Sequence, residues 1–206
     1  SESQGLASRF NEIGAQLRSV DSDTFDALQF RVTELNSLAE QLSIVNKKLS
    51  RQSSLESQPP DLLNTRDLLL QKISGLMKTK VSELANGEVN VSLGDSSNSM
   101  MLVSQGTYTQ VGLNETPGSL PVSLDLILDP TGKAENLNSV SSGEIGGLLS
   151  FRASTLKEAL QKINSLAETV AREVNQALAK GMDLYGTSGR SLFEISPEIV
   201  VDTAFV

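Results

Sequence analysis

The sequence predicts an α+β protein: an elongated bundle of long helices with a small antiparallel β-meander inserted between them. Apolar residues recur every three or four positions in long runs at both ends of the chain, as in helices that pack lengthwise. Between these runs apolar and polar residues alternate, which indicates half-buried strands. Aromatic residues make up only 4% of the 206 residues, so the core must be mainly aliphatic.

The first run predicts one long helix, or two in line, from about Gly5 to Ser50. Before a slip in the pattern the apolar row is Leu6, Phe10, Ile13, Leu17 and Val20, and after it Leu28, Val32, Leu35, Ala39, Leu42 and Val45. The slip falls at the polar segment 21–24. There the helix either breaks, with Asp or Ser as the new N-cap, or continues through a polar patch. Both alternatives stay open on the sequence.

A second, shorter helix is predicted over Leu62–Lys80, with Asp61 as its N-cap. The polar segment 53–60 precedes it and closes with a Pro-Pro pair, which marks a loop. The helical spacing makes its expected buried positions Leu63, Leu70, Ile73 and Met77.

Residues 81–140 are predicted to form the antiparallel meander. Val89, Val91 and Leu93 alternate with polar residues, and so do Val122, Leu124 and Leu126. Turn signals separate these strands at Asn86-Gly87, Gly94-Asp95, Pro117-Gly118 and 129–132.

The last long helix is expected over about Ser154–Lys180, after a shorter helical piece that starts at Glu144. Its apolar row is Leu156, Leu160, Ile163, Leu166, Val170, Val174 and Ala177. Gly181 is a natural stop. Residues 186–190 are expected to form a flexible turn, and residues 192–206 an extended segment. We therefore expect a rod-like helical domain over 1–190, with the β insertion at about 81–140, and the start of a following domain or a boundary segment over 191–206.

The composition argues against catalysis. The chain has no His and no Cys, which excludes catalytic triads and thiolate metal sites built from this chain alone. Carboxylate pairs such as Asp21 with Asp23, or Asp125 with Asp129, are more simply explained as exposed acids near turns. Glycine-rich stretches lack the strand and the Lys-Ser or Lys-Thr of a phosphate-binding loop. No catalytic residue, metal or cofactor is therefore expected.

The charge and hydropathy argue against two classes of partner. The net charge is −8 and no large basic cluster is present, so neither nucleic acid nor an anionic membrane surface is an expected partner. No apolar stretch approaches the roughly 20 residues that span a membrane.

Three motifs, in register, resemble the family of flagellar hook-associated proteins that begins the hook–filament junction. Residues 61–69, DLLNTRDLL, resemble its DLLDQRDxL; residues 142–152, SGEIGGLLSFR, resemble its GxLGGLLxFR; and Asn175 with 181–186 resembles its NxxHxxGxDxxG. Leu178 replaces the family's His, and Phe193 matches one aromatic of an FF pair whose other member here is Leu192. The expected structural motif positions are Asp61, Leu63, Arg66, Asp67, Gly143, Gly146, Gly147, Phe151, Arg152, Asn175, Gly181, Asp183 and Gly186. Gly146 and Gly147 are expected to form a close-packed turn that seats the apolar residues after them.

The resemblance implies a structural subunit and no enzyme activity. It implies export through the flagellar type III apparatus without a cleaved signal peptide, and a location outside the cell in a ring that joins hook to filament. The implied partners are the hook protein, the adjacent junction protein, further copies of itself in the ring and a dedicated export chaperone that acts through termini absent here. Because the family's terminal coiled-coil segments are missing, the chain is expected to be a core piece and a monomer in dilute solution.

Two alternatives stay open. The first is a related junction protein or a flagellin-like filament subunit, which also has long helices. The second is a helical adaptor or binding module, in which an exposed apolar helix face or a groove carries the function.

Overall fold

The computed structural model describes residues 2–93, 100–116, 123–128, 135–136, 142–182, 185–195 and 203–205. The chain forms two compact units. The first unit combines Ser1–Asp23 with Arg152–Val206, and the second consists of Thr24–Phe151. The described residues are mostly helical with small antiparallel sheets, so the predicted α+β class is confirmed.

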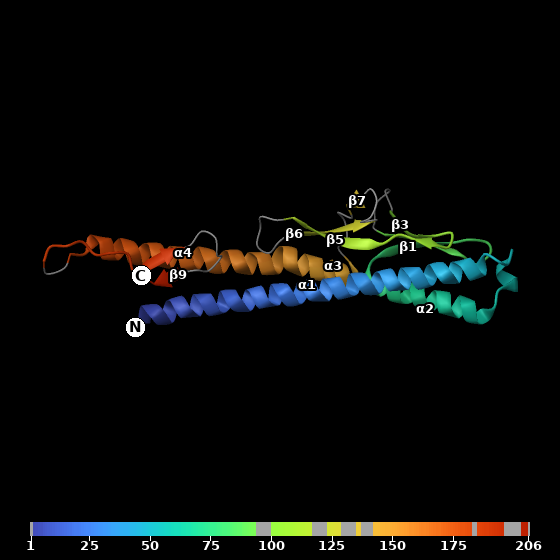
Figure 1. Ribbon diagram of the computed structural model, residues 1–206, viewed down its shortest axis with the longest axis horizontal. Helices are drawn as coiled ribbons and strands as arrows, with labels where there is room; N and C mark the ends of the chain where they lie inside the picture. Colours follow the sequence, from blue (N-terminus) through green and yellow to red (C-terminus); the bar gives the residue numbers. More distant parts are fainter. Residues whose placement is uncertain are drawn as a thin grey trace. The chain divides into compact units, whose positions relative to one another are not determined.

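Helix α1 runs without a break from Glu2 to Leu49, as Figure 1 shows. The prediction of one long helix is confirmed, and the alternative of two helices is wrong. Every seventh residue along α1 is buried or half-buried: Ala7, Gly14, Asp21, Leu28, Leu35, Leu42 and Leu49. The segment at 21–24 therefore places polar residues in the buried row, but the helix continues through it.

The first apolar row expected on α1 is displaced by one position. Of its members only Phe10 is buried, whereas Leu6, Ile13 and Val20 are 38%, 40% and 39% exposed. The buried row one residue later contains Ala7, Gly14 and Asp21, whose small or polar side chains carry little hydrophobic signal.

Helix α2 (Pro60–Leu76) differs from its predicted bounds at both ends. Pro60 occupies the first helical position, where a missing N–H costs no hydrogen bond, and Pro59 is the N-cap. Asp61 therefore lies inside the first turn and is not the N-cap. Met77 ends the helix, because the chain enters a strand at Thr79. Of the expected buried positions, Ile73 and Met77 are buried, while Leu63 and Leu70 are partly buried.

Among the described residues, the predicted meander is two antiparallel sheets. Strands β1 (Thr79–Glu83), β2 (Val89–Leu93), β3 (Met100–Ser104) and β4 (Thr107–Tyr108) form one in chain order. Strands β5 (Val111–Thr116), β6 (Ser123–Leu128) and β7 (Glu135–Asn136) form the other. The Asn86-Gly87 turn is confirmed between β1 and β2, with Gly87 at φ +85°. The other three predicted turns, and Val122, lie outside the described residues.

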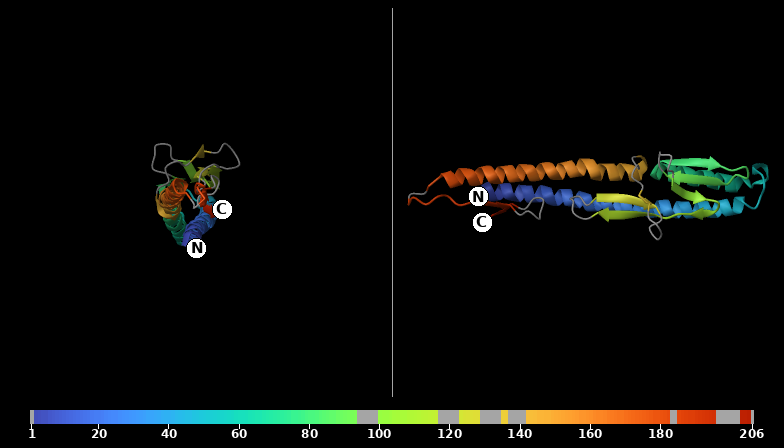
Figure 2. Two further views of the ribbon diagram at one scale, coloured as in Figure 1. Left: turned by 90° about the vertical axis from the view of Figure 1, so that its left-hand side faces the viewer. Right: turned by 90° about the horizontal axis from the view of Figure 1, so that it is seen from above.

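The core of the second unit lies where α1 and α2 meet the two sheets. Figure 2 shows the green strands β1–β4 lying along the cyan and teal helices α1 and α2. Fully buried aliphatic side chains from both helices and from the strands meet there, including Leu35 and Leu42 of α1, Ile73 of α2 and Val91 of β2. The short 3-10 helix Leu55–Ser57 connects α1 to α2, and α3 (Gly143–Ser150) adds Ile145 to the same core.

The first unit pairs the beginning of α1 with α4 (Lys157–Lys180), which follows the π-helix η2 (Phe151–Leu156). Ala7 packs with Ala171, and Phe10 packs with Ala167. The helix ends at Lys180 with Gly181 as its C-cap, as predicted. The predicted start of α4 at about Ser154 was wrong, because Ser154 lies inside η2. Leu166 and Ala177 of the predicted row are exposed.

The chain after α4 includes two short strands. Strand β8 (Phe193–Ile195) pairs antiparallel with β9 (Thr203–Phe205), in agreement with the expected extended segment.

Candidate functional site

The first motif fastens the β1–β2 hairpin to α2. Arg66 is only 8% exposed. Its Nη1 donates to Glu83 Oε1 at 2.6 Å and to the carbonyl oxygen of Gly87 at 2.7 Å, and its Nε donates to Asp67 Oδ1 at 2.8 Å. Burial opposes the charge, but the hydrogen bonds with Glu83 and Asp67 outweigh it and raise the pKa of Arg66. The guanidinium therefore stays protonated and holds the hairpin in place.

The other residues of this motif contribute in simpler ways. Leu63 packs against the core of the second unit. Asp61 is exposed, and its backbone carbonyl accepts a hydrogen bond from Thr65 Oγ1 at 2.7 Å.

Sequence reasoning missed three amide side chains that bind strand or loop backbone in the same unit. Asn46 and Asn36 of α1 bind the backbone of Val89 and Val111. Gln58 Nε2 donates to the carbonyl oxygens of Leu49 and Asn86. The sequence offers only a weak signal for such contacts. Asn46 lies on the apolar face of a helix, where an amide side chain needs a hydrogen-bond partner.

In the second motif, the backbone conformation and the surroundings at position 143 require a glycine. This residue has φ +79°, and a Cβ there would lie 2.5 Å from the carbonyl oxygen of Leu76. By contrast, Gly146 and Gly147 lie inside helix α3, and a Cβ on Gly147 would meet nothing within 4 Å. The expected close-packed turn at these two glycines is therefore wrong. Phe151 is also less well seated than expected, at 38% exposed.

Arg152, the last residue of that motif, forms a forked ion pair with Asp21 inside the first unit. Its Nε donates to Asp21 Oδ1 at 2.6 Å and its Nη2 donates to Oδ2 at 3.1 Å. Arg152 is 5% exposed. The expectation that Asp21 is an exposed acid is wrong, because α1 turns this carboxylate toward the opposing helix. Asp129 of the other proposed acidic pair lies outside the described residues.

The third motif fastens β8 to α4. Asn175 Nδ2 donates to the carbonyl oxygen of Phe193 at 2.7 Å, and its Oδ1 accepts from the N–H of Leu192 at 2.8 Å and of Phe193 at 3.0 Å. This contact explains why an Asn and an aromatic residue 18 positions later belong to one pattern.

The glycines after Asn175 shape the connection to β8. Gly181 caps α4, and Gly186 adopts φ +80°. Sequence reasoning missed Gly189, where a Cβ would collide with the carbonyl oxygen of Leu178. Asp183 lies outside the described residues.

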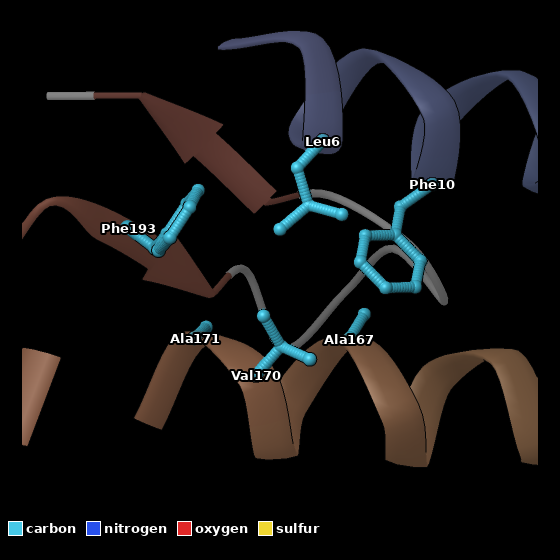
Figure 3. Close-up of a pocket in the computed structure, with 6 residues that line it drawn as sticks. All are labelled: Leu6, Phe10, Ala167, Val170, Ala171 and Phe193. Carbon is cyan, nitrogen blue, oxygen red and sulfur yellow. The ribbon is translucent and has the colours of Figure 1, made fainter. Parts of the chain in front are cut away.

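An apolar pocket lies beside this contact. Figure 3 shows Leu6 and Phe10 of α1 pointing toward Val170 of α4 and toward Phe193. Ala167 and Ala171 complete a lining without a polar side chain, and the space holds no water-sized gap. The pocket is therefore a packing contact with no place for a polar substrate.

The described part of the chain contains no group of three or more acidic side chains placed to hold a metal ion. In the same residues, no helix has both the length and the apolar character to cross a membrane.

These contacts define a structural domain, in which the motif side chains fasten strands and helix ends to helices. Residues 1–193 match the family described as the flagellar hook-associated protein FlgK helical domain, and the chain belongs to this family. The resemblance expected from the three motifs is thereby confirmed. Which motif positions the family requires stays a prediction.

The relatives are flagellar proteins of greater length. Flagellar hook-associated protein 1 of Salmonella typhimurium is 27% identical over 205 residues, covering 97% of this chain and 36% of the relative. The Bacillus subtilis protein of the same name is 27% identical over 218 residues, covering 94% and 42%. The solved structure of the flagellar hook junction protein FlgK from Burkholderia pseudomallei superposes with a TM-score of 0.81 and 31% identity, covering 94% of this chain and 35% of that one. The chain thus spans between a third and about two fifths of these proteins.

Proposed function

We propose that this chain is part of a structural subunit that joins the hook to the filament of the bacterial flagellum. The observation that carries the proposal is that the residues of the family motifs serve packing and attachment inside the domain. Arg66 and Asn175 bind the backbone at a hairpin and a strand, Arg152 pairs with Asp21 of α1, and Gly143 allows a close approach to the end of α2. A subunit that couples a bending hook to a stiff filament needs such fastening and no reactive group. The family match supports the same role.

The setting follows from the same proposal. The subunit is exported through the flagellar type III apparatus and acts outside the cell, without a cleaved signal peptide. Its partners are the hook protein, the adjacent junction protein, copies of itself in a ring and an export chaperone that binds the parts of the protein beyond this chain. It has no enzymatic activity. Residues 1–190 form its helical domain, residues 191–206 are the start of a following domain or a boundary segment, and the isolated segment is a monomer.

Deletion of the gene from its source bacterium tests the proposal. We expect hooks without filaments by electron microscopy, and filament protein released into the medium, because export continues while the junction is missing. The full-length gene supplied on a plasmid should restore filaments. A strain without its filament protein gene is the reference, since it also lacks filaments but releases no filament protein.

The same experiment separates a junction subunit from a flagellin-like subunit and from an adaptor. A flagellin-like subunit predicts that the deletion strain resembles the reference, with no filament protein in the medium. An adaptor unrelated to assembly predicts normal filaments and normal swimming. Either result would contradict the junction role.

A further inference from the structure

The two helices of the first unit follow different repeats. In α1 the buried row Ala7, Gly14, Asp21 advances by seven residues at each step. The opposing helix runs antiparallel to it, as the contacts of Ala7 with Ala171 and of Asp21 with Arg152 show. The spacing on that helix from Arg152 to Leu160 is eight residues, and from Leu160 to Ala167 it is seven. One extra residue therefore lies between Arg152 and Leu160.

The π-helix η2 takes up this extra residue. It occupies Phe151–Leu156, and the backbone is α-helical at both of its ends. A π-helix closes its turns with i→i+5 hydrogen bonds, so it holds about one more residue per turn than an α-helix. If η2 were α-helical, the residues after it would be rotated about 100° relative to Arg152. The η2 turn thus sets which face α4 presents to α1.

The Asp21–Arg152 pair holds η2 where it is. Arg152 is the second residue of η2, and its fork to both carboxylate oxygens fixes the position and the rotation of the guanidinium. Asp21 stands in the buried row of α1, where a polar residue selects one register over others.

The alternative register would also bury apolar side chains. The row one residue earlier on α4 contains Leu166, which is 53% exposed, and the half-buried Val170. After a rotation by one position, Leu166 would take the place of Ala167 against Phe10, and Val170 that of Ala171. The same rotation would place Lys162 and Glu173 where Ile163 and Val174 now pack, so only the Leu166 and Val170 positions of the shifted face are apolar replacements.

We propose that η2 is a two-state register element. With the Asp21–Arg152 pair intact it stays π-helical and α4 presents Ala167 and Ala171. When the pair is lost, η2 converts to an α-helix and α4 presents Leu166 and Val170. This inference is independent of the junction role, because it concerns only contacts inside the first unit.

Disulfide trapping tests it directly, because the chain has no native Cys. Ala7→Cys combined with Ala171→Cys reports the present register, and Ala7→Cys combined with Val170→Cys reports the shifted one. Both pairs are made in the parent, in Asp21→Asn and in the control Asp23→Asn, whose residue is exposed on the same helix. The rate of cross-link formation under mild oxidation is followed on non-reducing gels.

We expect Asp21→Asn to raise the rate of the Val170 pair relative to the Ala171 pair about tenfold, the loss of one charged hydrogen-bonded pair being sufficient for such a shift. Asp23→Asn should leave the ratio unchanged. An unchanged ratio in an Asp21→Asn variant that is still helical by circular dichroism overturns the proposal.

If Asp21→Asn does not fold, two single-residue deletions test the proposal instead. Deleting the exposed Ala153 removes the extra residue from η2, so a regular α-helix keeps Leu160 and Ala167 in their rows. Deleting the exposed Ser165 from α4 moves Ala167 and Ala171 out of theirs. We expect the melting temperature to stay within about 3 °C of the parent for the first deletion and to fall by more than about 8 °C for the second. Equal losses in the two deletions overturn the proposal.

Discussion

Asn46 of α1 and Val89 of β2 are joined by two hydrogen bonds. Asn46 Nδ2 donates to the carbonyl oxygen of Val89 at 2.7 Å, and the N–H of Val89 donates to Asn46 Oδ1 at 3.0 Å. The side-chain amide carries one donor group and one acceptor, so it satisfies the backbone of a strand residue as a neighbouring strand would. Asn36 does the same for Val111. Helix α1 thereby binds the sheets through side chains at Val89 and Val111, which also lie opposite Glu83 of β1 and Leu128 of β6.

The Asn46 contact predicts a large loss of stability on substitution. Asn46→Leu has a similar size but leaves the N–H and the carbonyl of Val89 without partners in the core, where Asn46 is fully buried. We expect the free energy of unfolding to fall by about 3 kcal/mol, since each unpaired buried group costs about 1–3 kcal/mol. Urea denaturation measures it. The control Asn64→Leu, at an exposed position of α2, should change it by less than about 0.5 kcal/mol. Similar values for the two variants would show that the contact contributes little.

Two glycines of one motif should respond to alanine with opposite signs. Gly143→Ala forces a Cβ toward the Leu76 carbonyl at positive φ, so we expect a loss of about 1–3 kcal/mol. Gly147→Ala places a methyl group in open space within α3 and should gain up to about 1 kcal/mol, because alanine favours the helix. Both values come from the same denaturation series. A loss at Gly147 as large as that at Gly143 would contradict the geometry of α3.

Local patterns in the sequence predicted the helices and strands better than their contacts. The α4 stop at Gly181 and the Asn86-Gly87 turn depend on a few neighbouring residues, and both are confirmed. On α1 the predicted row from Leu28 to Val45 is buried as expected. The first part of the row was misplaced, because Ala7 and Gly14 are small and apolar rows are found by their large members. The division of the strands into two sheets depends on pairing, which local periodicity does not encode.

The fastening contacts were beyond the reach of sequence patterns for a further reason. Asn46 and Val89 are 43 residues apart, and Asp21 and Arg152 are 131 apart. The motifs drew attention to Arg66, Arg152 and Asn175 but said nothing about their partners. The partner of a buried polar residue is set by the tertiary fold, and a single sequence shows only that a charge or an amide stands on an otherwise apolar face.

The stabilisation by Arg66 should not depend on pH near neutrality. The pKa of Arg66 is raised in the folded protein, so its contribution is fully present below the unfolded-state value and is lost only as the pH rises through the folded value. Both lie far above pH 9. We therefore expect Arg66→Met to lower the free energy of unfolding by the same amount, about 1–3 kcal/mol, throughout roughly pH 6 to 9.

The matched control is Lys72→Met, which removes one positive charge from an exposed position of the same helix. Urea denaturation at several pH values should show little change for this variant. The difference in the free energy of unfolding between Arg66→Met and the parent should not shrink from pH 6 to 9. A steady decrease would mean that the ionisation of another group controls the attachment of the hairpin to α2.

The packing of α1 against α4 links the fold to the proposed role. Ile163 is half-buried against Phe10 and Ala167. Ile163→Asp places a carboxylate without a partner in this contact, at a cost of several kcal/mol. In the full-length protein, expressed in the gene-deletion strain, we expect this change to leave hooks without filaments. Ser165→Asp adds the same charge two positions away at an exposed site and should support normal swimming. Normal filaments with Ile163→Asp present at the parent level would refute both the importance of this contact and the junction role assigned to the domain.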